Sequence, residues 1–270
     1  MTPTETGAAY NPGGPRAVHV TMSGHMRSRN GGRRLRRGAA LPVVALVLLA
    51  GCGDDGDPPP APDGPPKVAA CVGADGALVA DVDGDGRADR VLDPSGTGRR
   101  LAVAFGGRSG SGHPVPVREL AGDGAEDAKD VVGAVADFDR DGWPDLVVAA
   151  TGEWRGDDPV EPDVAEVRFG PFSASGGGQR TRGLDLGETR GLAVADYDHD
   201  RHPDLAVYAY AGDGVHEVQA RLGNVGTGLG DADERSRRYT VLPERFDEST
   251  PSGMPRDALS AFHPRCRDSG

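Results

Sequence analysis

Aspartate side chains recur at one fixed spacing in three short stretches, and their oxygens are the groups in this sequence best suited to binding a metal ion. Each stretch reads D-x-D-x-D-x-x-x-D and begins at Asp81, Asp137 or Asp196. A backbone that curls enough to bring such carboxylates together places like charges about 4 Å apart, where each pair repels by roughly 1 to 4 kcal/mol. We therefore expect a cation at each stretch.

The donor types in these stretches favour calcium. Carboxylates stand at positions 1, 3, 5 and 9, a backbone carbonyl is expected at position 7, and Gly86 and Gly142 supply the glycine of a sharp turn at position 6. An EF-hand also needs glutamate at position 12, where this sequence has Leu92, Val148 and Val207 within apolar runs. The stretches are therefore expected at the tips of β-hairpins. The alternative is three solvated acidic turns without an ion.

The three acidic stretches mark a repeat of just under sixty residues, because their first aspartates are 56 and 59 residues apart. Each has one apolar strand before it and one after it, then a strand that ends in an aromatic residue or leucine plus glycine, then a more polar strand. Four antiparallel strands per unit describe a propeller blade. The expected strands are residues 77–80, 91–92, 101–105 and 115–120; 131–136, 146–150, 164–169 and 179–186; and 192–195, 205–210, 218–222 and 239–242.

The aspartate loops, with the pairs Phe105-Gly106 and Phe169-Gly170 and the weaker Leu222-Gly223, resemble the FG-GAP and VCBS repeats of integrin α-subunits and many bacterial surface proteins. The resemblance covers about residues 72–245. It implies an all-β, propeller-like array of about three four-stranded blades, incomplete or partly closed, with calcium in the loops. The repeats would span about residues 72–130, 131–187 and 188–245, and residues 246–270 would form part of a fourth blade, cover an open edge or sit in an oligomer.

The resemblance also implies which residues hold calcium. Arg201 replaces the position-6 glycine of the third loop, and a residue with a side chain is strained at positive φ, so we expect two calcium sites and a weaker third. By position, the ligands would be the carboxylates of Asp81, Asp83, Asp85, Asp89, Asp137, Asp139, Asp141, Asp145, Asp196, Asp198, Asp200 and Asp204, and the backbone carbonyls of Arg87, Trp143 and His202.

Residues 1–51 have the features of an export signal. Six arginines between residues 27 and 37 precede an apolar run at 39–50 that is too short to span a bilayer. Residues 49–52 resemble the lipobox of bacterial lipoproteins, which implies a lipid on Cys52 and an extracytoplasmic protein anchored to the cell membrane. Arg33-Arg34 could mark twin-arginine export, and Met22 or Met26 could be the true start. Residues 52–66 are expected to form a tether rich in proline, aspartate and glycine, ahead of a repeat domain at 67–270.

Charge and cysteine content limit the possible partners and cross-links. Without residues 1–51 the chain has 23 basic and 41 acidic side chains, a net charge of −18, so we expect neither nucleic acid nor an anionic lipid surface as a partner. Cys71 and Cys266 lie near opposite ends of the domain, and an exported protein could join them in a disulfide worth about 5 kcal/mol, an upper figure on the chain-entropy model. Two separate thiols are the alternative.

The sequence contains no evident catalytic constellation. His113, His216 and His263 are isolated in expected turns without a nucleophile motif, and the regularly spaced carboxylates already belong to the metal loops. Trp143 could contact a ligand or pack over its own turn. We expect a module that binds or scaffolds a protein or carbohydrate ligand. The alternatives are an exported hydrolase or lyase on the same scaffold, and an adhesion ligand that uses the Arg-Gly-Asp triplet at 155–157.

Overall fold

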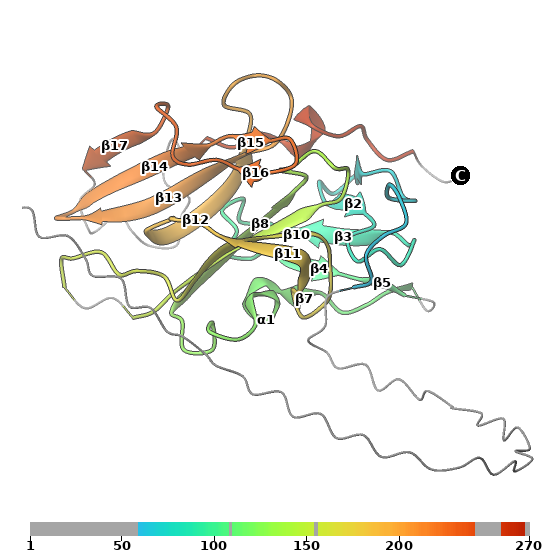
Figure 1. Ribbon diagram of the computed structural model, residues 1–270, viewed down its shortest axis with the longest axis horizontal. Helices are drawn as coiled ribbons and strands as arrows, with labels where there is room; N and C mark the ends of the chain where they lie inside the picture. Colours follow the sequence, from blue (N-terminus) through green and yellow to red (C-terminus); the bar gives the residue numbers. More distant parts are fainter. Residues whose placement is uncertain (1–58, 108–109, 154–155, 241–254, 268–270) are drawn as a thin grey trace, which may run out of the picture. The chain divides into compact units, whose positions relative to one another are not determined.

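The computed structural model describes residues 59–107, 110–153, 156–240 and 255–267, all within a unit that spans residues 51–270. Within these ranges nearly all regular structure is β-strand, apart from the short helix α1 (Val117–Ala121) and the 3-10 helix η2 (Leu259–Ala261) (Figure 1). The longer strands form three antiparallel sheets without a closed barrel. The fold is therefore all-β and propeller-like, as the sequence predicts.

The first sheet corresponds to the first repeat and carries one strand that the sequence did not reveal. Its strand order is β1-β2-β3-β4-β7, so β1 pairs with β2 ahead of the expected unit. The strands are β1 (Cys71–Val72), β2 (Leu78–Ala80), β3 (Asp89–Leu92), β4 (Ala102–Ala104) and β7 (Val115–Pro116).

The fourth strand expected at residues 115–120 is wrong beyond its first two residues, because the chain turns into α1 after Pro116. Val117, Leu120 and Ala121 are buried, and this i, i+3, i+4 spacing places them on one face of a helix, whereas a strand would point Val117 and Leu120 to opposite sides. The helix packs against β8 (Asp130–Ala136) of the second sheet. Burial of this face therefore decides the local structure.

The second and third sheets match the second and third repeats, each with four strands in chain order. One short hairpin follows β4 of the first sheet, and another follows the third strand of the third sheet. The second sheet consists of β8, β9 (Asp145–Thr151), β10 (Val164–Phe172) and β11 (Gly178–Gly183), and the third of β12 (Glu188–Ala195), β13 (Asp204–Gly212), β14 (Val215–Arg221) and β17 (Arg237–Thr240). The hairpins are β5 (Gly106–Gly107) with β6 (Gly110–Ser111), and β15 (Gly223–Asn224) with β16 (Gly228–Leu229).

The second sheet is packed between the other two, and β9 shows this most clearly. Its alternate residues Leu146 and Val148 join the apolar core shared with the first sheet, while Val147 and Ala149 join the core shared with the third. Side chains on a strand alternate between two faces, so a strand buried on both faces reads as a continuous apolar run. This packing gives the three sheets the arrangement of neighbouring propeller blades.

The described part of the C-terminal segment, residues 255–267, covers the β1 edge of the first sheet. Val72 N donates to Pro264 O at 2.8 Å, and Cys266 N donates to Val72 O at 2.9 Å. A disulfide joins Cys71 to Cys266. Further upstream, Asp257 N donates to Val194 O in β12 of the third sheet at 2.9 Å. Of the three roles considered for residues 246–270, the described contacts match that of an edge cover.

Residues 59–66 are the described part of the expected tether, and they contact the second sheet through β11 and the second acidic loop. Pro59 O accepts a hydrogen bond from Gln179 Nε2 at 2.6 Å, and Pro66 lies beside Gly142. Cys52 with its lipobox, Trp154 and Arg155 fall outside the described residues. Among the residues that the structure describes, no helix has the length and apolar character needed to cross a membrane.

Candidate metal centres

Each acidic loop connects the first two long strands of its sheet, as expected for a hairpin tip. The first loop (residues 81–89) joins β2 to β3, the second (137–145) joins β8 to β9, and the third (196–204) joins β12 to β13. In each, the residue before position 1 pairs with position 9 across the ladder, so the strands close the base of the loop.

Positions 4 and 6 of all three loops have positive φ. The sequence predicted this conformation at position 6, including the strained Arg201. It did not predict it at position 4, where only the first loop has glycine. Residues with side chains rarely adopt this region, so the same curl is imposed three times on different sequences. The φ values are 79°, 61° and 63° at Gly84, Arg140 and His199, and 82°, 95° and 68° at Gly86, Gly142 and Arg201.

The curl turns backbone N–H groups toward the carboxylates in the same order in every loop. The position-1 carboxylate accepts from the N–H of position 6, position 3 accepts from position 5, and position 5 accepts from position 7. The last of these bonds measures 2.8 Å in all three loops. These bonds fix the orientation of the carboxylates of positions 1, 3 and 5 in each loop.

The aspartate at position 9 makes a different set of contacts. Asp89, Asp145 and Asp204 are each 0 % exposed. In each, Oδ2 accepts a hydrogen bond from the N–H of position 2 at 2.7 to 2.9 Å. The other oxygen, Oδ1, accepts from the N–H of the glycine in the Phe-Gly or Leu-Gly pair at 2.5 to 2.9 Å. The position-9 carboxylate therefore ties its own loop to a glycine 17 to 25 residues further along the chain.

This contact also explains the Phe-Gly pairs. A Cβ at Gly106, Gly170 or Gly223 would lie 2.3, 2.3 or 2.4 Å from the backbone oxygen of position 8 in its loop. Only glycine permits so close an approach between two backbones. In the sequence the pairs are recognisable only as a family signature, and their physical role becomes evident from the bond to position 9.

In each loop, oxygens of three aspartates lie within 4.8 Å of one another, close enough to share one ion. The position-1 and position-3 aspartates belong to every group. Asp89, Asp141 and Asp200, also expected as ligands, lie outside these groups, and Arg87, Trp143 and His202 occupy position 7. The groups are Asp81, Asp83 and Asp85; Asp137, Asp139 and Asp145; and Asp196, Asp198 and Asp204.

The carboxylates of the second loop are held in an environment that disfavours their charge. Burial raises the pKa of Asp145 to about 8, and repulsion from Asp139 adds to the effect. Burial likewise raises the pKa of Asp137 to about 6, with repulsion from Asp141 as the next raising cause. A cation among these oxygens would stabilise the charged forms and lower these pKa values.

Arginines partly neutralise the loops. Arg180 NH2 lies 2.7 Å from Asp139 Oδ2, and its guanidinium stacks 3.3 Å above the ring of Phe169. Arg140 of the second loop pairs with Asp200 of the third, which joins the two loops directly.

A hard divalent cation fits the donor set of these loops. All side-chain donors in the three groups are carboxylate oxygens, which calcium prefers. In the third loop, Asp196 Oδ1 is buried without a hydrogen-bond partner among the described residues. A buried carboxylate oxygen without a partner is costly, and a bound cation would satisfy it.

Two expectations for individual side chains are resolved by the structure. His216 is not in a turn: it lies in β14 and is 3 % exposed. Its ring stacks on Tyr208, with centroids 5.4 Å apart, and lies tilted against Tyr210, with centroids 5.0 Å apart. Burial lowers the pKa of His216 to about 4, so the ring is neutral at pH 7. Trp143 is 5 % exposed and lies near Gly84 of the first loop. It packs between loops and is not an exposed contact residue.

The fold and its loops define an all-β repeat protein whose sheets carry acidic hairpin tips. A sequence model of the FG-GAP repeat matches residues 131–156, which contain β8, the second acidic loop and β9. An FG-GAP repeat is therefore found in the second sheet. The search of curated proteins returned no match.

Proposed function

We propose that this protein is a calcium-stabilised, propeller-like module that binds or scaffolds a protein or carbohydrate ligand outside the cytoplasm. The observation that carries the metal assignment is a loop geometry that recurs three times: backbone N–H groups bind the aspartates of positions 1 and 3, and the oxygens of these two converge with those of a third aspartate. The FG-GAP match at the second loop supports the extracellular, propeller-like class.

Calcium has a structural role in this proposal. The ion would be held in each loop by the converging carboxylates and would offset their mutual repulsion. Because it binds the folded chain and not the unfolded one, it stabilises the fold by about 2.7 kcal/mol per site at a concentration of 100 times Kd.

Calcium titration and thermal unfolding test this role. We expect two tight sites and one weaker site by calorimetry, and a melting temperature that falls by many degrees on chelation. Asp139→Ala should remove one tight site, and Asp198→Ala should remove the weaker one. A melting curve that is the same with calcium and with chelator would exclude the metal assignment.

Lipid anchoring through Cys52 is proposed from the lipobox at residues 49–52. Mass spectrometry of the exported protein should find an acylated N-terminal cysteine, and Cys52→Ser should release the protein from the membrane fraction. Recovery of the wild-type protein without a lipid would contradict the anchor.

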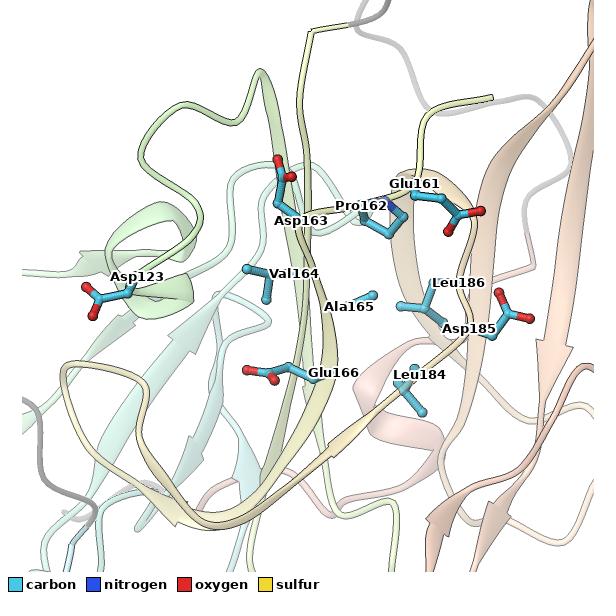
Figure 2. A pocket seen from close by; sticks show the side chains of 10 residues that line it. All are labelled: Asp123, Glu161, Pro162, Asp163, Val164, Ala165, Glu166, Leu184, Asp185 and Leu186. Atoms are coloured by element: carbon cyan, nitrogen blue, oxygen red, sulfur yellow. The ribbon is translucent and has the colours of Figure 1, made fainter. Parts of the chain in front are cut away.

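Among the cavities that lie away from the acidic loops, one with a strongly acidic lining bears on the enzymatic alternative. It measures about 470 Å³, and its acidic lining residues are Asp123, Glu161, Asp163, Glu166 and Asp185. Their carboxylates point in different directions (Figure 2), and Glu166 is paired with Arg168. None of the residues that line this cavity is a histidine, cysteine or serine. This cavity therefore gives the hydrolase or lyase hypothesis no support.

A further inference from the structure

The sheets are linked by a contact that repeats from one blade to the next. In each later sheet, the end of the third strand or the hairpin that follows it reaches the acidic loop of the sheet before it. Phe172 N of the second sheet donates to Val82 O in the first loop at 2.8 Å. Gly226 N, between β15 and β16 of the third sheet, donates to Asp139 O in the second loop at 2.7 Å. The first and second loops are thus each supported by the following blade.

The third acidic loop receives comparable support from the C-terminal segment. Among the described residues no further blade follows the third sheet. Asp196 N, at position 1, donates to Asp257 Oδ2 at 2.9 Å, and Asp257 N donates to Val194 O at 2.9 Å. Asp257 therefore holds the junction between β12 and the third loop through both its side chain and its backbone.

The segment that carries Asp257 is fixed at its other end by a covalent bond. Cys266 is joined to Cys71, and residues 264–266 pair with β1. The segment thus connects the third loop to the first sheet (Figure 1).

The third loop has two features that make this support matter for ion binding. Arg201 holds a positive φ of 68° where the other loops have glycine, so the curl is strained. Asp196, whose N–H is bound by Asp257, is also the residue with the unpartnered buried oxygen. One residue thus joins the segment to the ion site.

We propose that residues 255–267 complete the third loop in place of a further blade, with Asp257 as the positioning residue, and that cation binding and segment docking reinforce each other. This inference rests on the proposed calcium function. Coupling between two binding events is reciprocal: if docking strengthens ion binding by a given factor, the ion strengthens docking by the same factor.

Calorimetric calcium titration of the wild type and Asp257→Ala tests the first half of this coupling. We expect the affinity of the site that Asp198→Ala removes to fall about tenfold in Asp257→Ala, with the other two sites unchanged. Asp75→Ala is the matched control, because it also removes a carboxylate that accepts a backbone N–H, in the β1–β2 turn, and it should leave all three sites intact. The disulfide-free Cys71→Ser/Cys266→Ser variant should weaken the same site.

Hydrogen exchange tests the reciprocal half. Calcium should slow amide exchange in residues 255–267 of the wild type, and this protection should be lost in Asp198→Ala. Equal calcium affinities in Asp257→Ala and the wild type, or exchange in this segment that calcium does not change, would overturn the inference alone. If the wild type binds calcium but Asp198→Ala removes none of the binding, the inference is overturned as well. If the wild type binds no calcium at any loop, both the inference and the proposed function are overturned.

Discussion

Replacing Gly170 with alanine tests whether close backbone packing requires the glycine of the Phe-Gly pair. The new Cβ would lie 2.3 Å from Pro144 O and 3.0 Å from Trp143 Cβ. A backbone oxygen cannot swing aside as a side chain can, so the strand must shift and Gly170 N must leave Asp145 Oδ1, now 2.9 Å away. Forced overpacking costs about 1 to 3 kcal/mol, and a lost hydrogen bond to a charged group about 1.5 to 3 kcal/mol.

The two effects together predict a loss of about 2.5 to 6 kcal/mol. In a domain of about 200 residues, 1 kcal/mol corresponds to about 2 to 4 °C, so the melting temperature should fall by roughly 5 to 24 °C. Thermal unfolding followed by circular dichroism in saturating calcium measures this directly.

Gly183→Ala provides the matched control, since it makes the same chemical change in β11 of the same sheet. A Cβ at Gly183 would meet no atom within 4 Å, and the residue has no positive φ. Its melting temperature should be unchanged or slightly raised, because alanine restricts the unfolded chain by about 0.4 to 1 kcal/mol. A Gly170→Ala protein that melts within about 2 °C of the wild type, or equal shifts in the two variants, would refute the close-packing explanation.

Asp145→Ala should destabilise the fold by roughly 2 to 6 kcal/mol in urea titrations, because two buried backbone N–H groups lose their acceptor at about 1 to 3 kcal/mol each. A loss under about 1 kcal/mol would contradict the bridging role of the Asp145 carboxylate. In chelator, stability should fall as the pH rises. The folded-state pKa values of Asp145 (about 8) and Asp137 (about 6) exceed the unfolded value of 3.8. The contribution of these two carboxyl groups to the free energy of unfolding is therefore complete below pH 3.8 and is lost as the pH passes 6 and then 8. Melting curves from pH 4 to 8 check this, and a rising melting temperature would be the wrong sign. Cys71→Ser/Cys266→Ser should lose up to about 5 kcal/mol, because it opens a loop with a sequence separation of 195, and reduction of the wild type should reproduce the loss.

The repeat architecture was predictable because its signals are local. Each aspartate loop lies within nine residues, and each adjoining strand shows either alternation or a continuous apolar run, so both can be read without knowing the fold. The α1 helix was not predictable, because five residues are too few for either period to stand out. Its buried face is determined by contacts with the second sheet. The two-residue strand β1 was missed for a similar reason, since residues 264–266 bind one of its edges.

The candidate metal residues were easier to find than their roles. The spacing identified the carboxylates, but it could not show that the oxygens at positions 1 and 3 converge in every loop, or that the position-9 carboxylate also binds the N–H of a glycine 17 to 25 residues further along the chain. That contact depends on where the third strand passes. His216 was misassigned because its aromatic neighbours come from β13, which becomes adjacent only when the hairpin forms.

The attachment of β1 to the end of the chain determines how the domain would respond to mechanical load. Cys71 is the first residue of β1 and is covalently joined to Cys266. Tension applied to the polypeptide ahead of Cys71 reaches this cross-link before it can peel β1 from β2, and the force then passes into residues 255–267 and, through Asp257, into the third sheet. The first and third sheets would thus share a force applied from the N-terminal side. After chemical reduction of the disulfide, the same force would unfold the strands one after another, beginning with the first sheet.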